Sequence, residues 1–215
     1  MQVSMIYRSP VAVPRPYGSY RYDVFSPKAK RRLTLYGEAA LMAYVDLEAD
    51  PQVTDLCERP LIIDGSKPRR AVDFWSLKNG QVHYYLLLRG RESAEKFLAR
   101  AAVADFVYWA EQAKAKVVTI DPAALKSRRY RYYNLAHMLQ CVSIFGTHVE
   151  HSFRPKALSL LPPTFNLEQG AHAVFPEELS IGRALIFREL IEGRLTCPNL
   201  NDFALGSSTQ FTTKL

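Results

Sequence analysis

The sequence predicts an α/β fold in which helices pack against a mixed sheet, and three features support this prediction. Residues 59–91 contain three short β-type runs, which turn signals at 64–66 and 78–80 separate from one another. An Ala-rich amphipathic stretch follows at 92–115, and an apolar run comes next at 116–120. A helix that crosses over a sheet between two parallel strands produces this order of elements.

Positive charge is concentrated in three segments of this 215-residue chain. The chain has 28 Lys and Arg residues against 21 Asp and Glu residues, which gives a formal net charge of +7. Clustered basic side chains favour a polyanionic partner such as DNA, and the alternative is a solvated basic surface. The clusters are Lys28, Lys30, Arg31 and Arg32; Lys67, Arg69 and Arg70; and Lys126, Arg128, Arg129 and Arg131.

The three cysteines, Cys57, Cys141 and Cys197, are far apart in the sequence and form no CxxC pair. This spacing argues against a zinc ribbon and against a disulfide framework. The first residues lack the apolar core of a signal peptide, and no apolar run approaches membrane-spanning length. We therefore expect a cytoplasmic protein without a membrane partner.

Residues 1–35 are predicted to form an extended basic arm. Pro10, Pro14 and Pro16 prevent a helix there, because proline lacks a backbone donor and fixes φ. Arginines and tyrosines are interleaved along the segment, and this combination suits contact with nucleic acid or with an acidic protein groove.

Residues 36–145 are predicted to form the α/β domain. Asp73 falls inside the second β-type run, and Asn79-Gly80 suits a two-residue hairpin to the third run because both positions tolerate positive φ. Glu38 stands in the first turn of a helix predicted at about 36–49. There it is either a site residue or a carboxylate that the positive end of the helix dipole favours.

Residues 146–174 are predicted to be an irregular linker, because they contain several prolines and few periodic apolar residues. Residues 175–215 are predicted to form a small winged-helix-like module, in which a helix at 181–191 precedes a β-hairpin. Gly193 is well placed to end that helix.

Several short motifs follow one another along nearly the whole chain. They include Phe25-Ser26-Pro27-Lys28, Asp46-Leu47-Glu48-Ala49-Asp50-Pro51, Val72-Asp73-Phe74 and Leu190-Ile191-Glu192-Gly193-Arg194-Leu195. In this order the chain resembles the TnsA family, the endonuclease subunits of heteromeric transposases, which cut the non-transferred strand at transposon ends. The resemblance implies a restriction-endonuclease-like PD-(D/E)xK domain, a three-layer sandwich around a mixed sheet, with the small module at its C-terminal side.

The resemblance also implies a bacterial, cytoplasmic transposition machinery. The implied partners are transposon-end or target DNA, a TnsB-like transposase and a TnsC-like AAA+ ATPase. Whether the chain works as a homodimer or beside an active paralogue stays open in the sequence.

The catalytic positions depart from the family pattern. Family members carry a Glu on the first helix, an Asp in a Pro-Asp-Phe step, and an acid-x-Lys type of tripeptide. The resemblance places these positions at Ala40, at Asp73, and at Leu87 with Arg89, so only Asp73 keeps a carboxylate. Magnesium binds oxygen ligands, which Ala and Leu side chains do not have. We therefore expect Asp73 to be vestigial, no cofactor to be bound, and Arg89 to contact DNA phosphate.

Three functions follow from these observations. The leading interpretation is an inactive nuclease-fold subunit that binds DNA and bridges the transposase and its ATPase regulator. The second is an active Mg²⁺-dependent endonuclease, which would have to use Glu38, Asp73 and Glu92 as its carboxylates. The third is a protein–protein adaptor without a DNA role.

Overall fold

The computed structural model describes residues 7–90, 92–149 and 153–214. Its contacts divide the chain into two compact units, one of residues up to 48 with 52–127, the other of 49–51 with residues from 128 onward. The predicted α/β domain ended at 145, whereas the first unit ends at 127, because helix α5 (Arg129–Phe145) packs against α8 (Leu179–Ile191) of the second unit. No helix among the described residues combines the length and the apolarity that crossing a membrane requires.

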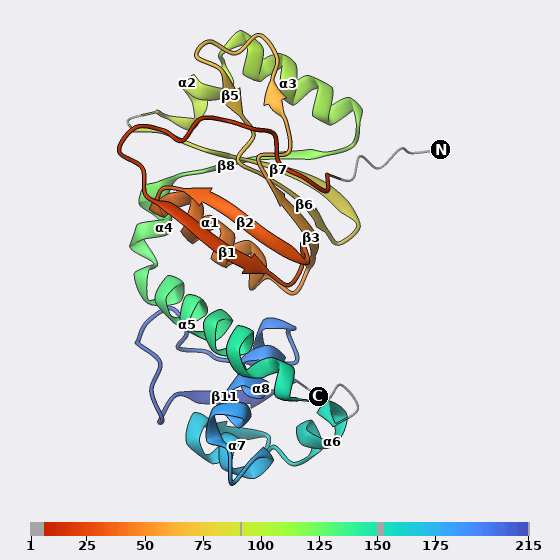
Figure 1. The fold of residues 1–215 in the computed structure, drawn as a ribbon, viewed down its shortest axis with the longest axis vertical. Helices are drawn as coiled ribbons and strands as arrows, with labels where there is room; N and C mark the ends of the chain where they lie inside the picture. Colours follow the sequence, from red (N-terminus) through yellow and green to blue (C-terminus); the bar gives the residue numbers. More distant parts are fainter. Residues whose placement is uncertain (1–6, 91, 150–152, 215) are drawn as a thin grey trace. The chain divides into compact units, whose positions relative to one another are not determined.

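The first unit is built on a mixed sheet, which has four strands in the described part of the chain (Figure 1). β6 pairs antiparallel with β3 and with β7, and β7 pairs parallel with β8, so the strand order is β3-β6-β7-β8. The predicted parallel strand after the crossover is therefore confirmed. The strands are β3 (Val53–Glu58), β6 (Phe74–Lys78), β7 (Gln81–Leu87) and β8 (Lys116–Ile120).

The hairpin between β6 and β7 forms at the predicted Asn79-Gly80 turn. Lys78 pairs with Gln81, which leaves two residues in the loop, with φ of 50° at Asn79 and 73° at Gly80. Positive φ at both positions is the geometry of a type I′ turn. The first predicted run is not part of this sheet, because β4 (Ile62–Ile63) pairs with β5 (Arg70–Ala71) in a separate two-stranded sheet.

Helices α2 (Ala94–Leu98) and α3 (Ala101–Gln112) cover one face of the main sheet (Figure 1). Phe97 of α2 is buried in one cluster with Trp75 and Tyr84 of the sheet. Burial of large apolar side chains is the main favourable term in folding, so this cluster is a major part of the core of the unit.

A break between α2 and α3 replaces the single helix that the sequence predicts at 92–115. Ala99 ends α2, and Arg100 takes an extended conformation with φ −67° and ψ 130° before α3 begins. The Arg100 guanidinium donates a hydrogen bond of 2.7 Å to Glu92. Alanine and arginine both favour helices, so the composition of this stretch gave no signal for the break.

The opposite side of the sheet carries α1 and the hairpin of β1 and β2 (Figure 1). The hairpin contradicts the extended arm predicted for 1–35 from Arg21 onward, whereas residues 7–20 contain no helix or strand and residues 1–6 lie outside the described part of the chain. Leu33 and Leu35 are buried and alternate with more exposed neighbours, the period-2 pattern of a half-buried strand. The elements on this side are β1 (Arg21–Ser26), β2 (Arg31–Tyr36) and α1 (Glu38–Glu48), and α4 (Pro122–Ser127) follows β8.

A buried carboxylate joins the hairpin to α1. Glu48 accepts a hydrogen bond of 2.6 Å from the Ser26 hydroxyl and one of 3.1 Å from the Lys28 backbone N–H. The Lys28 ammonium donates to the Leu47 carbonyl at 2.9 Å. Lys28 is therefore held at the C-terminal end of α1, where the helix dipole favours a cation.

The second unit contradicts the irregular linker predicted for 146–174. A capping box starts helix α7, because the Asn166 side chain accepts from the Gln169 N–H at 2.8 Å and the Gln169 side chain accepts from the Asn166 N–H at 3.1 Å. The prolines of this segment favoured an irregular linker in the prediction, and the capping box was not recognised. The segment contains the 3₁₀ turn η1 (Gly146–His148), α6 (Arg154–Ser159), β9 (Thr164–Asn166) and α7 (Leu167–Val174).

The predicted C-terminal hairpin is confirmed and gains a third strand. β10 (Leu195–Thr196) pairs antiparallel with β11 (Gln210–Thr213), and β9 pairs with the other edge of β11. Gly193 follows α8 with φ 81°, the conformation that favours glycine after a helix. The winged-helix-like description of residues 175–215 stays a prediction.

A buried asparagine holds the long loop between β10 and β11. The Asn134 side-chain amide of α5 donates to the carbonyls of Leu200 at 2.8 Å and Phe203 at 2.7 Å. Its oxygen accepts from the Leu205 N–H at 3.0 Å. These hydrogen bonds satisfy a polar group that would otherwise be costly to bury.

Replacing Gly182 by alanine should destabilise the second unit, although alanine favours helices. The added Cβ would lie 2.6 Å from the Ala171 carbonyl oxygen, so α7 and α8 would have to move apart. Overpacking of this kind lowers the free energy of unfolding by about 1–3 kcal/mol, which urea denaturation of the full chain measures. Gly206→Ala is the matched control, because nothing lies within 4 Å of its added Cβ. Equal effects of the two substitutions would contradict this packing.

Candidate nucleic-acid-binding cleft

A cleft of about 640 Å³ opens in the first unit, beside the ends of β6 and β7. Ala40 reaches it from α1, Asp73 from the bend before β6, Leu87 from the end of β7, and Arg89 from the segment that follows. The four positions that the sequence singled out as family catalytic positions therefore line one cleft.

Glu38 does not belong to this cleft, although Ala39 and Ala40 do. Its carboxylate is half-exposed and lies 3.5 Å from the Lys126 ammonium, within the same unit. The structure thus separates Glu38 from Asp73 and pairs it with one of the predicted DNA-binding lysines.

The sequence predicted that Asp73 lies inside a strand, but in the structure it comes directly before β6. Its backbone still extends the pairing, because its N–H donates to the Tyr85 carbonyl and its carbonyl accepts from the Arg59 N–H, both at 2.9 Å. The side chain is mostly buried, with 19% of its surface exposed. Its Oδ2 accepts a hydrogen bond of 2.7 Å from the Leu87 N–H.

The guanidinium of Arg70 lies against the Asp73 carboxylate, at 3.5 Å. It also donates to the Leu87 carbonyl and lies 3.9 Å from the Glu92 carboxylate. The centre of the guanidinium is 5.0 Å from the centre of the Phe97 ring, a cation–π contact. Arg70 is only 6% exposed, so the prediction that it contacts DNA is wrong.

Burial dominates the electrostatics of this group. It raises the pKa of Asp73, although Arg70 and the Leu87 N–H act in the opposite direction. Burial also lowers the pKa of Arg70, although Asp73 and Glu92 act to raise it. For each of the two groups, the loss of solvation outweighs the attraction of the partner's charge, which is common for buried ion pairs.

Glu92 is held in its ionised form by donors around it. Burial acts to raise its pKa, but hydrogen bonds from the Arg89 N–H and the Arg100 guanidinium, and the charge of Arg70, bring the pKa below the ordinary value. The two hydrogen bonds measure 2.8 Å and 2.7 Å. Glu92 is therefore the ion-pair partner of Arg70 and Arg100.

The residues of the cleft do not fit a divalent cation. Magnesium requires several oxygen ligands, and the side chains of Ala40 and Leu87 have none. The Arg70 guanidinium already contacts the Asp73 carboxylate and the Leu87 carbonyl oxygen. Within the described residues, no three His, Cys, Asp or Glu side chains come close enough to hold a metal ion.

Exposed arginines give the cleft a positive lining. Arg15, Arg69 and Arg89 are exposed along it. Arg59, which the sequence did not single out, is more buried and lies over the Tyr36 ring, 5.0 Å from its centre.

The predicted DNA-binding residues divide into exposed and internally bound side chains. Arg31 is bound by the buried Glu58 at 2.6 Å and 3.0 Å, so it supports the fold, as Arg70 and Lys28 do. For Arg31 and Lys28, which keep part of their surface exposed, contact with DNA stays a prediction. Arg131 is half-buried, and the exposed members are Lys30, Arg32, Lys67, Arg69, Arg89, Lys126, Arg128 and Arg129.

Comparisons with protein families and with curated proteins do not assign this chain to a family. The chain matches no protein-family profile, and a search of curated proteins finds no match. The chemistry of the cleft therefore has to be inferred from its own residues.

Arg70→Met should destabilise the first unit by about 3–5 kcal/mol at pH 7.5, because it leaves Asp73 and Glu92 without their shared cation. A carboxyl group with a raised pKa favours folding below its ordinary pKa, and that contribution is lost as the pH rises through the raised value. The loss of stability should therefore be smaller at pH 4.5 than at pH 7.5 in urea denaturation. Arg69→Met, at the exposed neighbour, is the matched control, and an equal loss there would contradict the buried pair.

Proposed function

We propose that this chain is a TnsA-like subunit of a DNA transposition machinery, a nuclease-fold protein that binds DNA without cutting it. One observation carries the proposal: Ala40, Asp73, Leu87 and Arg89 line one cleft, and a buried arginine holds the remaining carboxylate. The proposal includes the restriction-endonuclease-like three-layer sandwich and the winged-helix-like C-terminal module.

The convergence of these positions supports the alignment with the family. Ala40 was identified by counting back from the Asp50-Pro51 motif, and Leu87 and Arg89 by their place after the hairpin. These choices used sequence alone, and on α1 both Ala40 and its neighbour Ala39 line the cleft. Glu38, which a shifted register would require, pairs with Lys126 outside it.

Charge supports DNA as the ligand. The carboxylates on the cleft wall are Glu58 and Asp73, and each already has an arginine partner. The exposed arginines of the cleft therefore present charge that is not neutralised by these acids. Phosphate contacts of this kind supply most of the affinity of non-specific DNA binding.

The same side chains explain why cleavage is not expected. Hydrolysis of a phosphodiester by this class of enzyme needs a divalent cation, which supplies an activated water and stabilises charge on the phosphorus oxygens. A guanidinium does not act as a general base in this chemistry, so Arg89 does not replace the lysine of the family pattern in that role. It can still bind a phosphate through its planar donors.

The partners in this proposal come from the resemblance. They are transposon-end or target DNA, a TnsB-like transposase and a TnsC-like AAA+ ATPase, between which a non-cutting subunit would act as a bridge in the bacterial cytoplasm. An active paralogue would complete the machinery if both strands are cut.

Nicking of DNA tests the inactive site. With supercoiled DNA that carries transposon ends, in Mg²⁺ or Mn²⁺, the full chain should leave the fraction of nicked circles at background. Asp73→Asn should give the same result, since the carboxylate binds no catalytic ion. Cleavage that disappears in Asp73→Asn would show that the site is an active endonuclease.

DNA affinity tests the role of the cleft. Arg69→Gln and Arg89→Gln should each weaken binding to duplex DNA several-fold and reduce the slope of log affinity against log salt by about 1. Fluorescence polarisation over a range of salt concentrations measures both quantities. Lys116→Gln is the matched control, because it makes the same charge change where β8 pairs with His83, at the far end of the β7–β8 ladder from Leu87.

The salt series also separates DNA binding from the adaptor function. Weak affinity that does not depend on salt, with no difference between Arg89→Gln and Lys116→Gln, would favour a protein–protein adaptor without a DNA role.

A further inference from the structure

A second cavity, of about 520 Å³, lies in the first unit and has Arg70 in its lining. It is bounded by the turn between β4 and β5, by the segment after β7, and by the start of α3. Arg70 lines this cavity and Asp73 lines the cleft, whereas Arg89 and Pro68 line both. Of the four positions that the resemblance implies, Arg89 alone also lines this cavity.

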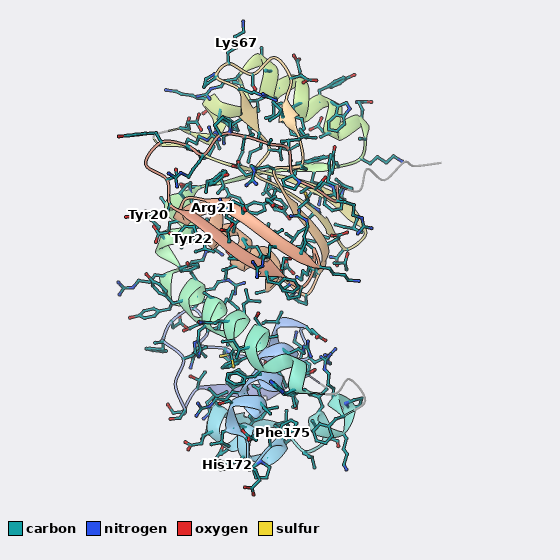
Figure 2. The ribbon with its side chains drawn as sticks, in the orientation of Figure 1. Tyr20, Arg21, Tyr22, Lys67, His172 and Phe175 are labelled. Carbon is teal, nitrogen blue, oxygen red and sulfur yellow. The ribbon has the colours of Figure 1, made fainter. Side chains whose placement is uncertain are left out.

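Positive charge exceeds negative charge around this cavity. Its cationic side chains are Lys67, Arg70, Arg89 and Arg100, and its acidic side chain is Glu92. Glu92 is already engaged by Arg100 at 2.7 Å and by Arg70 at 3.9 Å. Lys67 lies on the outer rim and its side chain extends away from the unit (Figure 2).

The first turn of α3 forms part of the same wall, through Ala101, Ala102 and Val103. The N-cap residue Arg100 makes no side-chain capping hydrogen bond at the start of this twelve-residue helix. The Val103 N–H donates to the Arg100 carbonyl at 2.9 Å, and the N–H groups of the first turn carry the positive end of the helix dipole. Helix starts of this kind bind phosphate and other oxyanions.

Arg70 supplies an independent observation. Its side chain is almost completely buried, and its Nε has no hydrogen-bond partner among the described residues. Burial lowers the pKa of Arg70, and the nearby charges of Arg89 and Arg100 lower it further. An anion in the cavity would offset this repulsion among three guanidinium groups.

We propose that this cavity binds a phosphate group, with Arg89, Arg100 and the first turn of α3 around its oxygens. Phosphate of this kind has two sources, a small phosphate anion or the backbone of bound DNA. The inference goes beyond the proposed function and stands without it, because binding of inorganic phosphate or pyrophosphate requires no DNA.

A carboxylate placed at the start of α3 tests the proposal. Ala102→Asp puts negative charge on the cavity wall, and it should not harm the helix because Asp is favoured in the first turn. Ala104→Asp makes the same charge change in the same turn at an exposed position that does not line the cavity. Circular dichroism and the unfolding temperature establish that both variants are folded.

The measurements are calorimetric titrations with inorganic phosphate and pyrophosphate at constant ionic strength, and polarisation titrations with duplex DNA. Ala102→Asp should weaken binding about tenfold relative to Ala104→Asp, the ratio that corresponds to the loss of one charged hydrogen bond. Weaker binding of pyrophosphate identifies a small anion as the ligand, and weaker binding of DNA alone identifies a backbone phosphate. Equal affinities of the two variants for all three ligands, or no binding of any of them by the unmodified chain, would overturn the proposal.

A second pair of variants keeps the test decisive if Ala102→Asp does not fold. Arg100→Gln removes a cation from the cavity, and Lys96→Gln removes one from an exposed position of α2 outside it. The proposal predicts a loss of phosphate or DNA affinity in Arg100→Gln only. Equal affinities in this pair would overturn it as well.

Discussion

The centre of the first unit depends on the interactions of the Arg70 guanidinium. It contacts the carboxylates of Asp73 and Glu92 and the carbonyl of Leu87, which come from three separate segments of the chain. A buried cation allows two carboxylates to lie near each other without strong repulsion. A guanidinium carries a single positive charge and no water ligand to activate, so it offsets part of the carboxylate charge without supplying the chemistry of a metal ion.

The same residue explains how two basic surfaces arise in one unit. Asp73 lines the cleft and Arg70 lines the second cavity, so their ion pair connects the two linings. On both sides the acidic side chains already have arginine partners, so the exposed Arg69 and Arg89 carry charge that these acids do not neutralise. Both proposals of phosphate binding depend on this excess of positive charge.

Local signals in the sequence predicted the parts of the structure that depend on neighbouring residues. The hairpin needs only Asn79-Gly80, and the end of α8 needs only Gly193. The role of a basic residue depends on partners that are distant in sequence, and clustering of charge does not reveal them. Arg31 is bound by Glu58, 27 positions later, and Arg70 donates to the carbonyl of Leu87, 17 positions later. The resemblance anticipated which positions meet in the cleft, but not the arginine behind them.

Binding of a divalent cation tests the central claim most directly. Titration calorimetry with Mn²⁺, carried out on the unmodified chain and on Asp73→Asn, compares the two proteins with and without this carboxylate. The account predicts the same result for both, because Arg70 and the Leu87 N–H already engage the Asp73 side chain. A Mn²⁺ site in the unmodified chain that is lost in Asp73→Asn would show that Asp73 serves a metal ion and would contradict the account.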